Sequence, residues 1–202
     1  MKTRVLLSIL FVGIIALGAF ATPIEYISAN IVPTKFLPGD GTLTLSGTLP
    51  LVIQYAGPVN VPIEGASFYF QTYLKTDTSA GGHVAGDFSG GTLVLSGPGG
   101  GNLLSGTVGD LALSEMFNDV GVLVANGSFK AESGSLLGDF GYPNGLIYEI
   151  AFRVEPRVLN DLTVEFNGVS NISLAPVVPE PVTLGLLSLG LAGLALYRRK
   201  RS

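Results

Sequence analysis

The sequence predicts an all-β protein, an antiparallel β-sandwich or jelly roll, flanked by an N-terminal signal peptide and a C-terminal transmembrane helix. Three observations predict it. Short segments alternate apolar and polar residues, as half-buried strands do. The chain of 202 residues contains 28 glycines and 12 prolines, which supply tight turns between such strands. The long uncharged apolar stretches lie at the two ends of the chain.

The N-terminus has the parts of a secretory signal peptide. Lys2 and Arg4 form a positive region, and residues 5–20 are almost wholly apolar. Ala19 and Ala21 supply small side chains at the two positions that a signal peptidase requires. We expect signal peptidase to cleave after Ala21. The alternative, an uncleaved anchor helix, is disfavoured by the short apolar length.

The alternating segments of the body predict strands joined by glycine-rich turns. Residues 111–117 also fit a short helix, with Leu113, Met116 and Phe117 on one side. The spacing of the strands favours one antiparallel sandwich or jelly roll. The alternating segments are 42–46, 68–74, 92–96, 146–155 and 163–166.

The charge of residues 22–176 excludes several classes of partner. This body carries five lysines and arginines against fourteen carboxylates, a net charge of −9. Such a field repels nucleic acid and anionic lipid, whose binding needs clustered basic side chains. Cysteine is absent, so neither a disulfide framework nor a thiolate zinc site can form. The body must therefore be stabilised by a packed core.

The C-terminal end predicts a membrane anchor. Residues 182–197 carry no charge and would form a helix of roughly 24 Å, enough to span a bilayer when the flanking basic side chains snorkel. The positive-inside rule keeps a basic cluster on the cytoplasmic side, and so it places the body across the membrane. The cluster that serves as the membrane stop is Arg198, Arg199, Lys200 and Arg201.

The residues before this apolar stretch carry a recognisable motif. Val178, Pro179, Glu180 and Pro181 precede the predicted helix, and an arginine-rich end follows it. The two prolines hold the segment extended at the membrane surface. In this order the last 25 or so residues resemble the PEP-CTERM sorting signal of Gram-negative bacteria. The alternative is a proline stop before an ordinary single-span anchor.

The resemblance implies recognition by an exosortase, a membrane-embedded cysteine protease-transpeptidase, in bacteria that often make exopolysaccharide. We therefore expect three parts: a signal peptide (1–21), an acidic all-β exported domain (22–176) and a sorting signal (177–202). The body would be anchored to the inner membrane on its periplasmic side before processing, and would then reach the cell surface or extracellular matrix.

Few residues of the body are candidates for a catalytic or metal-binding role. The single histidine, His83, lies in a glycine-rich segment, and no Gly-x-Ser-x-Gly elbow accompanies it, so we predict no catalytic residues and no enzyme activity. Asp110, Glu115 and Asp119 offer oxygen ligands for Ca²⁺, but their spacing matches no EF-hand loop and solvated carboxylates are favoured. We predict no metal and no cofactor.

Three functions follow from these patterns. The leading one is a non-enzymatic structural or adhesive component of the envelope or matrix, linked to exopolysaccharide or biofilm. The second is a carbohydrate- or calcium-binding module, and the third is a secreted hydrolase that uses an acidic pair or His83. Tyrosines available for stacking on sugars are Tyr55, Tyr69, Tyr73, Tyr142 and Tyr148. Three of them fall in predicted strands, where core or cross-strand packing is the commoner role.

Overall fold

The computed structural model describes residues 24–55, 57–116, 122–138, 147–154 and 160–176. These residues form eight strands and one short 3₁₀ helix, η1. The elements are β1 (Ile24–Leu37), β2 (Thr42–Tyr55), β3 (Val59–Asp77), β4 (Ala85–Ser96), β5 (Asn102–Glu115), β6 (Leu123–Ser133), η1 (Ser135–Leu137), β7 (Ile147–Val154) and β8 (Phe166–Pro176). The all-β prediction is confirmed.

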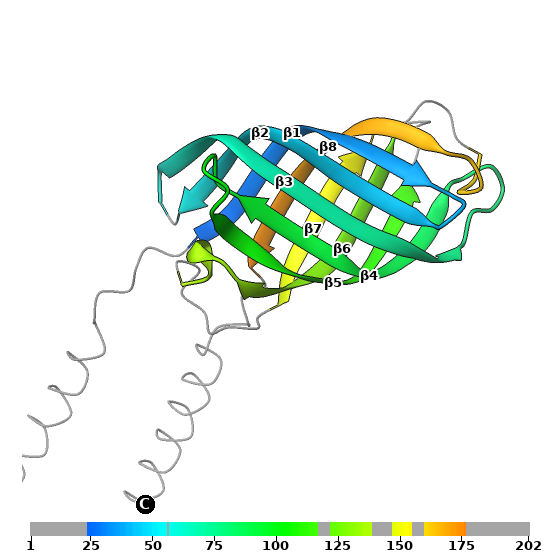
Figure 1. The fold of residues 1–202 in the computed structure, drawn as a ribbon. Helices are drawn as coiled ribbons and strands as arrows, with labels where there is room; N and C mark the ends of the chain where they lie inside the picture. Colours follow the sequence, from blue (N-terminus) through cyan, green and yellow to red (C-terminus); the bar gives the residue numbers. More distant parts are fainter. Residues whose placement is uncertain (1–23, 56, 117–121, 139–146, 155–159, 177–202) are drawn as a thin grey trace, which may run out of the picture.

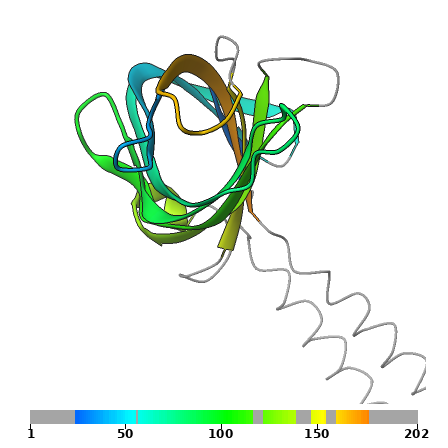
Figure 2. The same ribbon diagram turned by 90° about the vertical axis from the view of Figure 1, so that its right-hand side faces the viewer.

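The strands form a closed antiparallel barrel in which each strand pairs with the next along the chain (Figure 1). The ring is completed by β1 and β8, which pair from Ile27↔Leu174 to Phe36↔Phe166. Figure 2, which looks along the barrel, shows the strands as a ring. The prediction of a sandwich or jelly roll is therefore wrong, because the first strand pairs with the last and no strand crosses over to a second sheet.

The predicted short helix at 111–117 is also wrong for the described residues of that range. Residues 111–115 are the end of β5, where Leu111 and Leu113 are buried and their neighbours Ala112 and Ser114 are exposed. This period of two is that of a strand, whereas a helix would repeat every 3.6 residues. Phe117 lies outside the described residues.

The interior of the barrel is filled by apolar side chains. Phe36 packs edge-on to Phe88, with ring centroids 6.0 Å apart, and stacks on Phe166 at 5.2 Å. Each fully buried side chain of this size contributes roughly 1.5–3 kcal/mol to folding. The largest of the fully buried side chains are Phe36, Phe68, Phe70, Phe88, Phe129, Ile24, Ile27, Leu43, Leu45 and Leu51.

A buried pair of hydroxyls lies inside the barrel at the seam between β1 and β8. The hydroxyl of Thr34 donates to the carbonyl oxygen of Val32 at 3.2 Å and is itself hydrogen-bonded to the hydroxyl of Ser170. Both residues are almost fully buried. Because the Thr34 hydrogen points to Val32, Ser170 is the donor of the second bond. This polar pair fixes one register of the seam within a mostly apolar interior.

The two described ends of the chain leave the barrel at the same rim. Ile27 on β1 lies opposite Leu174 on β8, so Ile24 and Pro176 lie close to one level (Figure 1). The turn at 97–101 and η1 belong to this rim, whereas the segments 38–41, 78–84 and 160–165 belong to the other. Among the described residues, no helix has the length and apolar character needed to cross a membrane. The predicted signal peptide and the predicted helix 182–197 lie outside these residues.

A comparison of two buried threonines tests this description of the core. Within the described part of the protein, the hydroxyl of Thr72 is buried without a hydrogen-bond partner. An unsatisfied buried hydroxyl costs about 1–3 kcal/mol. Thr72→Val should therefore raise the free energy of unfolding by about 1 kcal/mol, measured by urea denaturation.

The matched control is Thr34→Val, which removes the partner of Ser170. It should lower the free energy of unfolding by about 1–3 kcal/mol, because the Ser170 hydroxyl is then left buried and unpaired. Equal effects of the two substitutions on the free energy of unfolding would contradict the assignment of Thr72 as unpaired and Thr34 as hydrogen-bonded.

Candidate functional site

The outer wall formed by β3, β4, β5 and β6 brings together polar side chains that are distant in sequence. One row across the wall contains Tyr73, Ser89 and Asp110, which face one another in the strand register. The next row contains Thr76, Asp87, Ala112 and Asn126. Asp87 and Asp110 are therefore diagonal neighbours on adjacent strands, with Cα atoms about 7–8 Å apart.

A hollow of about 570 Å³ opens at these rows. The hollow forms here because Ala112, which lies between the outward residues Asp110 and Ser114 on β5, has only a methyl side chain. Phe88 and Leu111 also line it but are themselves buried. The lining residues are Lys75, Thr76, Asp87, Phe88, Asp110, Leu111, Ala112 and Asn126.

Three β-bulges shape the wall around the hollow. On β3, Lys75 is the extra residue between Leu74 and Thr76, which pair with Phe88 and Asp87. On β4, Gly90 and Gly91 together oppose the single residue Thr72 of β3, and both glycines have positive φ values of 71° and 106°. On β5, Gly109 and Asp110 together oppose Ser128 of β6. A bulge bends its strand and changes the direction of a side chain, which is why bulges are common beside functional sites.

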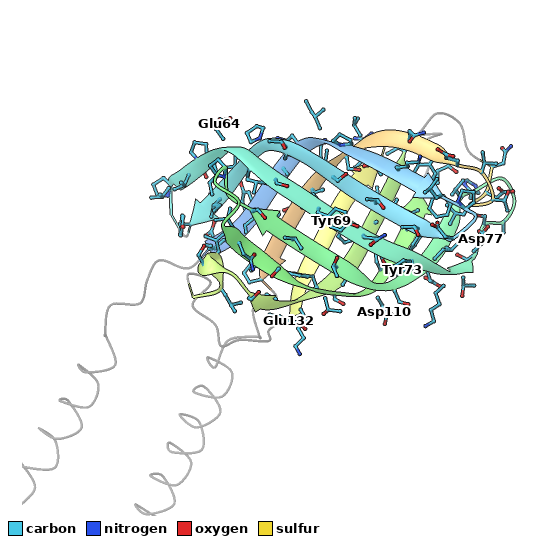
Figure 3. The ribbon with its side chains drawn as sticks, viewed as in Figure 1. Glu64, Tyr69, Tyr73, Asp77, Asp110 and Glu132 are labelled. Carbon is cyan, nitrogen blue, oxygen red and sulfur yellow. The ribbon has the colours of Figure 1, made fainter. Side chains whose placement is uncertain are left out.

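Tyr69 and Tyr73 lie on the outer face of β3 (Figure 3). Tyr73 shares a cross-strand row with Asp110, which lines the hollow, and Tyr69 lies further along the strand. The exposed fractions of Tyr69 and Tyr73 are 37% and 45%, whereas Phe68 and Phe70 between and beside them point into the core. The hydroxyl of Tyr69 donates to Oε1 of Gln71 at 3.0 Å. The two tyrosines are four residues apart, about 13 Å along a strand.

The other tyrosines singled out from the sequence do not join this face. Tyr55 packs against the hydrophobic core. Tyr142 and the side chain of Tyr148 lie outside the described part of the protein. The exposed aromatic face is thus made by Tyr69 and Tyr73.

Two of the three calcium candidates, Asp110 and Glu115, are not brought together. Asp110 is exposed on the outer wall, whereas Glu115 at the end of β5 is turned toward the loop before β4 and its side chain is only 5% exposed. Asp119 lies outside the described residues. Among the residues that are described, no group of three histidine, cysteine or carboxylate side chains is placed to hold a metal ion.

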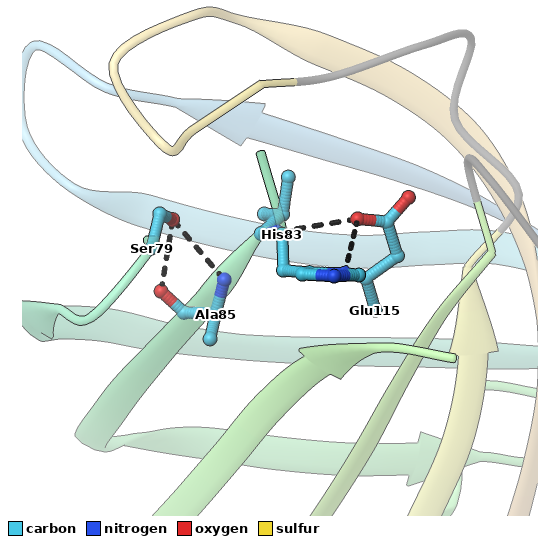
Figure 4. Close-up of polar contacts among 5 residues, drawn as sticks. Ser79, His83, Ala85 and Glu115 are labelled. Carbon is cyan, nitrogen blue, oxygen red and sulfur yellow. Dashed lines mark hydrogen bonds and ion pairs between the residues drawn. The ribbon is translucent and has the colours of Figure 1, made fainter. Parts of the chain in front are cut away.

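His83 and Glu115 secure the segment between β3 and β4 (Figure 4). Oε2 of Glu115 accepts a hydrogen bond from the backbone N–H of Val84 at 3.2 Å and lies 3.9 Å from Nδ1 of His83. The hydroxyl of Ser79 donates to the carbonyl oxygen of Ala85 and accepts from its N–H. These bonds hold the backbone in place, which is a structural role for Ser79 and Glu115.

The hydroxyl and the backbone N–H of Thr163 both donate to the Asp161 carboxylate and lower its pKa. Asp161 is partly exposed and lies before β8, at the rim that does not carry the chain ends. It stabilises a local turn.

Sequence reasoning named Tyr69 and Tyr73 among five candidate tyrosines but missed the grouping of Lys75, Asp87, Asp110 and Asn126. No motif marks this group, because it depends on strand register and on β-bulges. The predicted sorting residues Val178, Pro179, Glu180 and Pro181, the basic cluster Arg198, Arg199, Lys200 and Arg201, and the cleavage residues Ala19 and Ala21 lie outside the described residues.

Comparison with known families assigns the C-terminal segment. The model of the PEP-CTERM protein-sorting motif matches residues 177–201, which confirms the resemblance for this segment of the chain. Comparison with curated proteins and with solved structures gives no match. The barrel therefore has to be interpreted from its own geometry.

Proposed function

We propose that this protein is an exosortase-sorted component of the bacterial envelope or extracellular matrix, and that its barrel is a non-enzymatic adhesive or structural module. The observation that carries the proposal is the sorting motif at residues 177–201. This motif implies export, a membrane-anchored sorting signal and processing by an exosortase. The body is the part that would remain outside the cytoplasm after processing.

The position of the chain ends supports this arrangement. Ile24 and Pro176 are at one rim of the barrel, so a leader and a tail connected to them join the body at the same end (Figure 1). The outer wall with Tyr69 and Tyr73 runs along the barrel away from that end (Figure 3). A body tethered at one rim can present such a wall to the surrounding matrix.

The polar side chains support a non-enzymatic role. The hydroxyl of Ser79 is engaged with both backbone groups of Ala85, and His83 lies beside the Glu115 carboxylate. A serine nucleophile needs a base in hydrogen-bond contact with its hydroxyl. Ser79 is instead held by the backbone, which favours attachment or packing over acyl-transfer chemistry.

Substitution of the sorting motif tests the proposed processing and sorting of the protein. Changing Pro179, Glu180 and Pro181 to alanine should abolish exosortase processing and reduce retention of the protein at the cell surface or in the matrix. The measurement is cell fractionation with mass spectrometry of the C-terminus in an exosortase-containing host.

The matched control changes Pro62 and Glu64 to alanine, because both are exposed on the barrel and lie outside the motif. This control should be processed normally. An intact C-terminal Ser202 on the unsubstituted protein, in a host whose exosortase processes other substrates, would contradict the proposal.

A second experiment tests the proposal that the barrel has no catalytic activity. Asp87 and Asp110 form a carboxylate pair, and glycoside hydrolases use two carboxylates about 5–10 Å apart. We expect no release of reducing ends when neutral or anionic polysaccharides are incubated with the purified protein. Release that disappears in both Asp87→Asn and Asp110→Asn would show that the barrel is a hydrolase.

A further inference from the structure

We propose that the hollow on the β3–β6 wall, together with Tyr73 and Tyr69, is a binding site for a neutral polysaccharide chain. The inference deepens the adhesive role proposed above and rests on it. It names the ligand class and the residues that would recognise it.

The polar groups of the hollow suit a ligand rich in hydroxyls. The carboxylates of Asp87 and Asp110 accept hydrogen bonds, the Lys75 ammonium donates them, and the Asn126 amide does both. All four side chains line the same hollow. A sugar ring offers hydroxyls on several sides, and such groups both donate and accept, so it can satisfy this mixed set.

The two tyrosines add an apolar surface of the kind on which sugar rings stack. An aromatic ring provides a flat face with a negative quadrupole and a polar hydroxyl at its edge. Tyr73 lies in the same cross-strand row as Asp110, at the margin of the hollow. Tyr69 extends the surface by about 13 Å along β3. A chain-like ligand can contact both rings, whereas a single sugar cannot.

The site is built on strands, and glycines beneath it let two of these strands approach closely. A Cβ atom on Gly127 would overlap Leu111, and one on Gly109 would overlap the Ser128 hydroxyl. The absence of side chains there lets β5 and β6 approach closely below the hollow. The β5 bulge directly includes Asp110. Groups fixed in this way lose little conformational entropy when a ligand binds.

The negative charge of the site disfavours anionic polysaccharides. The hollow holds two carboxylates against one ammonium group, and the body as a whole carries a net charge of −9. An anionic glycan would therefore meet like charge, and the repulsion would be strongest at low ionic strength. A neutral glycan avoids this repulsion, which is why we assign a neutral chain.

The experiment measures binding of the full-length protein, purified in detergent, to three soluble polymers by isothermal titration calorimetry. The polymers are a neutral glucan, anionic alginate and cationic chitosan. We expect binding to the neutral glucan that changes less than threefold between low and high salt. Tyr73→Ala and Asp110→Asn should each weaken it at least tenfold, while Tyr73→Phe, which keeps the ring face, should stay within threefold.

The control variants lie on the opposite wall. In a ring of eight strands β1 is diametrically opposite β5. Glu25 is an exposed carboxylate on β1, and Tyr26 on β1 donates its hydroxyl to Gln54. Glu25→Gln and Tyr26→Ala should leave glucan binding unchanged. Circular dichroism and thermal unfolding of each variant separate a lost contact from a lost fold.

Three results would overturn the inference. One is equal loss of glucan binding in the site variants and in the opposite-wall controls. Another is binding of alginate as tight as that of the glucan. The third is binding of chitosan alone, lost at high salt, which would indicate simple charge attraction. Because the test uses purified protein, its failure is distinct from a failure of exosortase processing.

Discussion

The pairing of β1 with β8 is the constraint on which the rest of the structure depends. It joins the first and last strands of the described chain, which contact one another across 136 residues at Thr34 and Ser170. Without this seam the sheet would have two open edges with unpaired backbone groups, which favour association with other chains. With it, every strand has two neighbours, and the apolar side chains are enclosed. A chain without cysteine is therefore stabilised by closure and by packing.

Closure also determines what the outer surface can do. Since the interior is occupied by phenylalanine, leucine and isoleucine side chains, we place ligand recognition on the outside. Each outward position belongs to a fixed row across neighbouring strands. The β3–β6 wall combines two exposed tyrosines with a polar hollow, and three bulges shape it. The recognition site that we propose is a consequence of strand register in a rigid barrel.

The sequence was sufficient to predict strands and insufficient to predict their arrangement. Alternation in 68–74 and 92–96 identifies inward residues such as Phe70 and Leu93, which are indeed buried. The same alternation and turns occur in sandwiches and barrels, so the choice depended on a long-range pairing that no local pattern encodes. The grouping of Asp87 with Asp110 is hidden for the same reason. By contrast, the sorting motif at 177–201 is a linear signal that an enzyme recognises in an extended chain, and it was found from sequence alone.

The sorting motif implies export of the protein, and we propose that the β3–β6 wall then binds a neutral polysaccharide. The most direct test is a ¹⁵N chemical-shift titration of the protein with a neutral glucan oligosaccharide. The account predicts shifts clustered on β3–β6 around Tyr73, Asp87, Asp110 and Asn126, with β1 and β8 unchanged. Shifts confined to the β1–β8 side of the barrel, or none at saturating oligosaccharide, would contradict it.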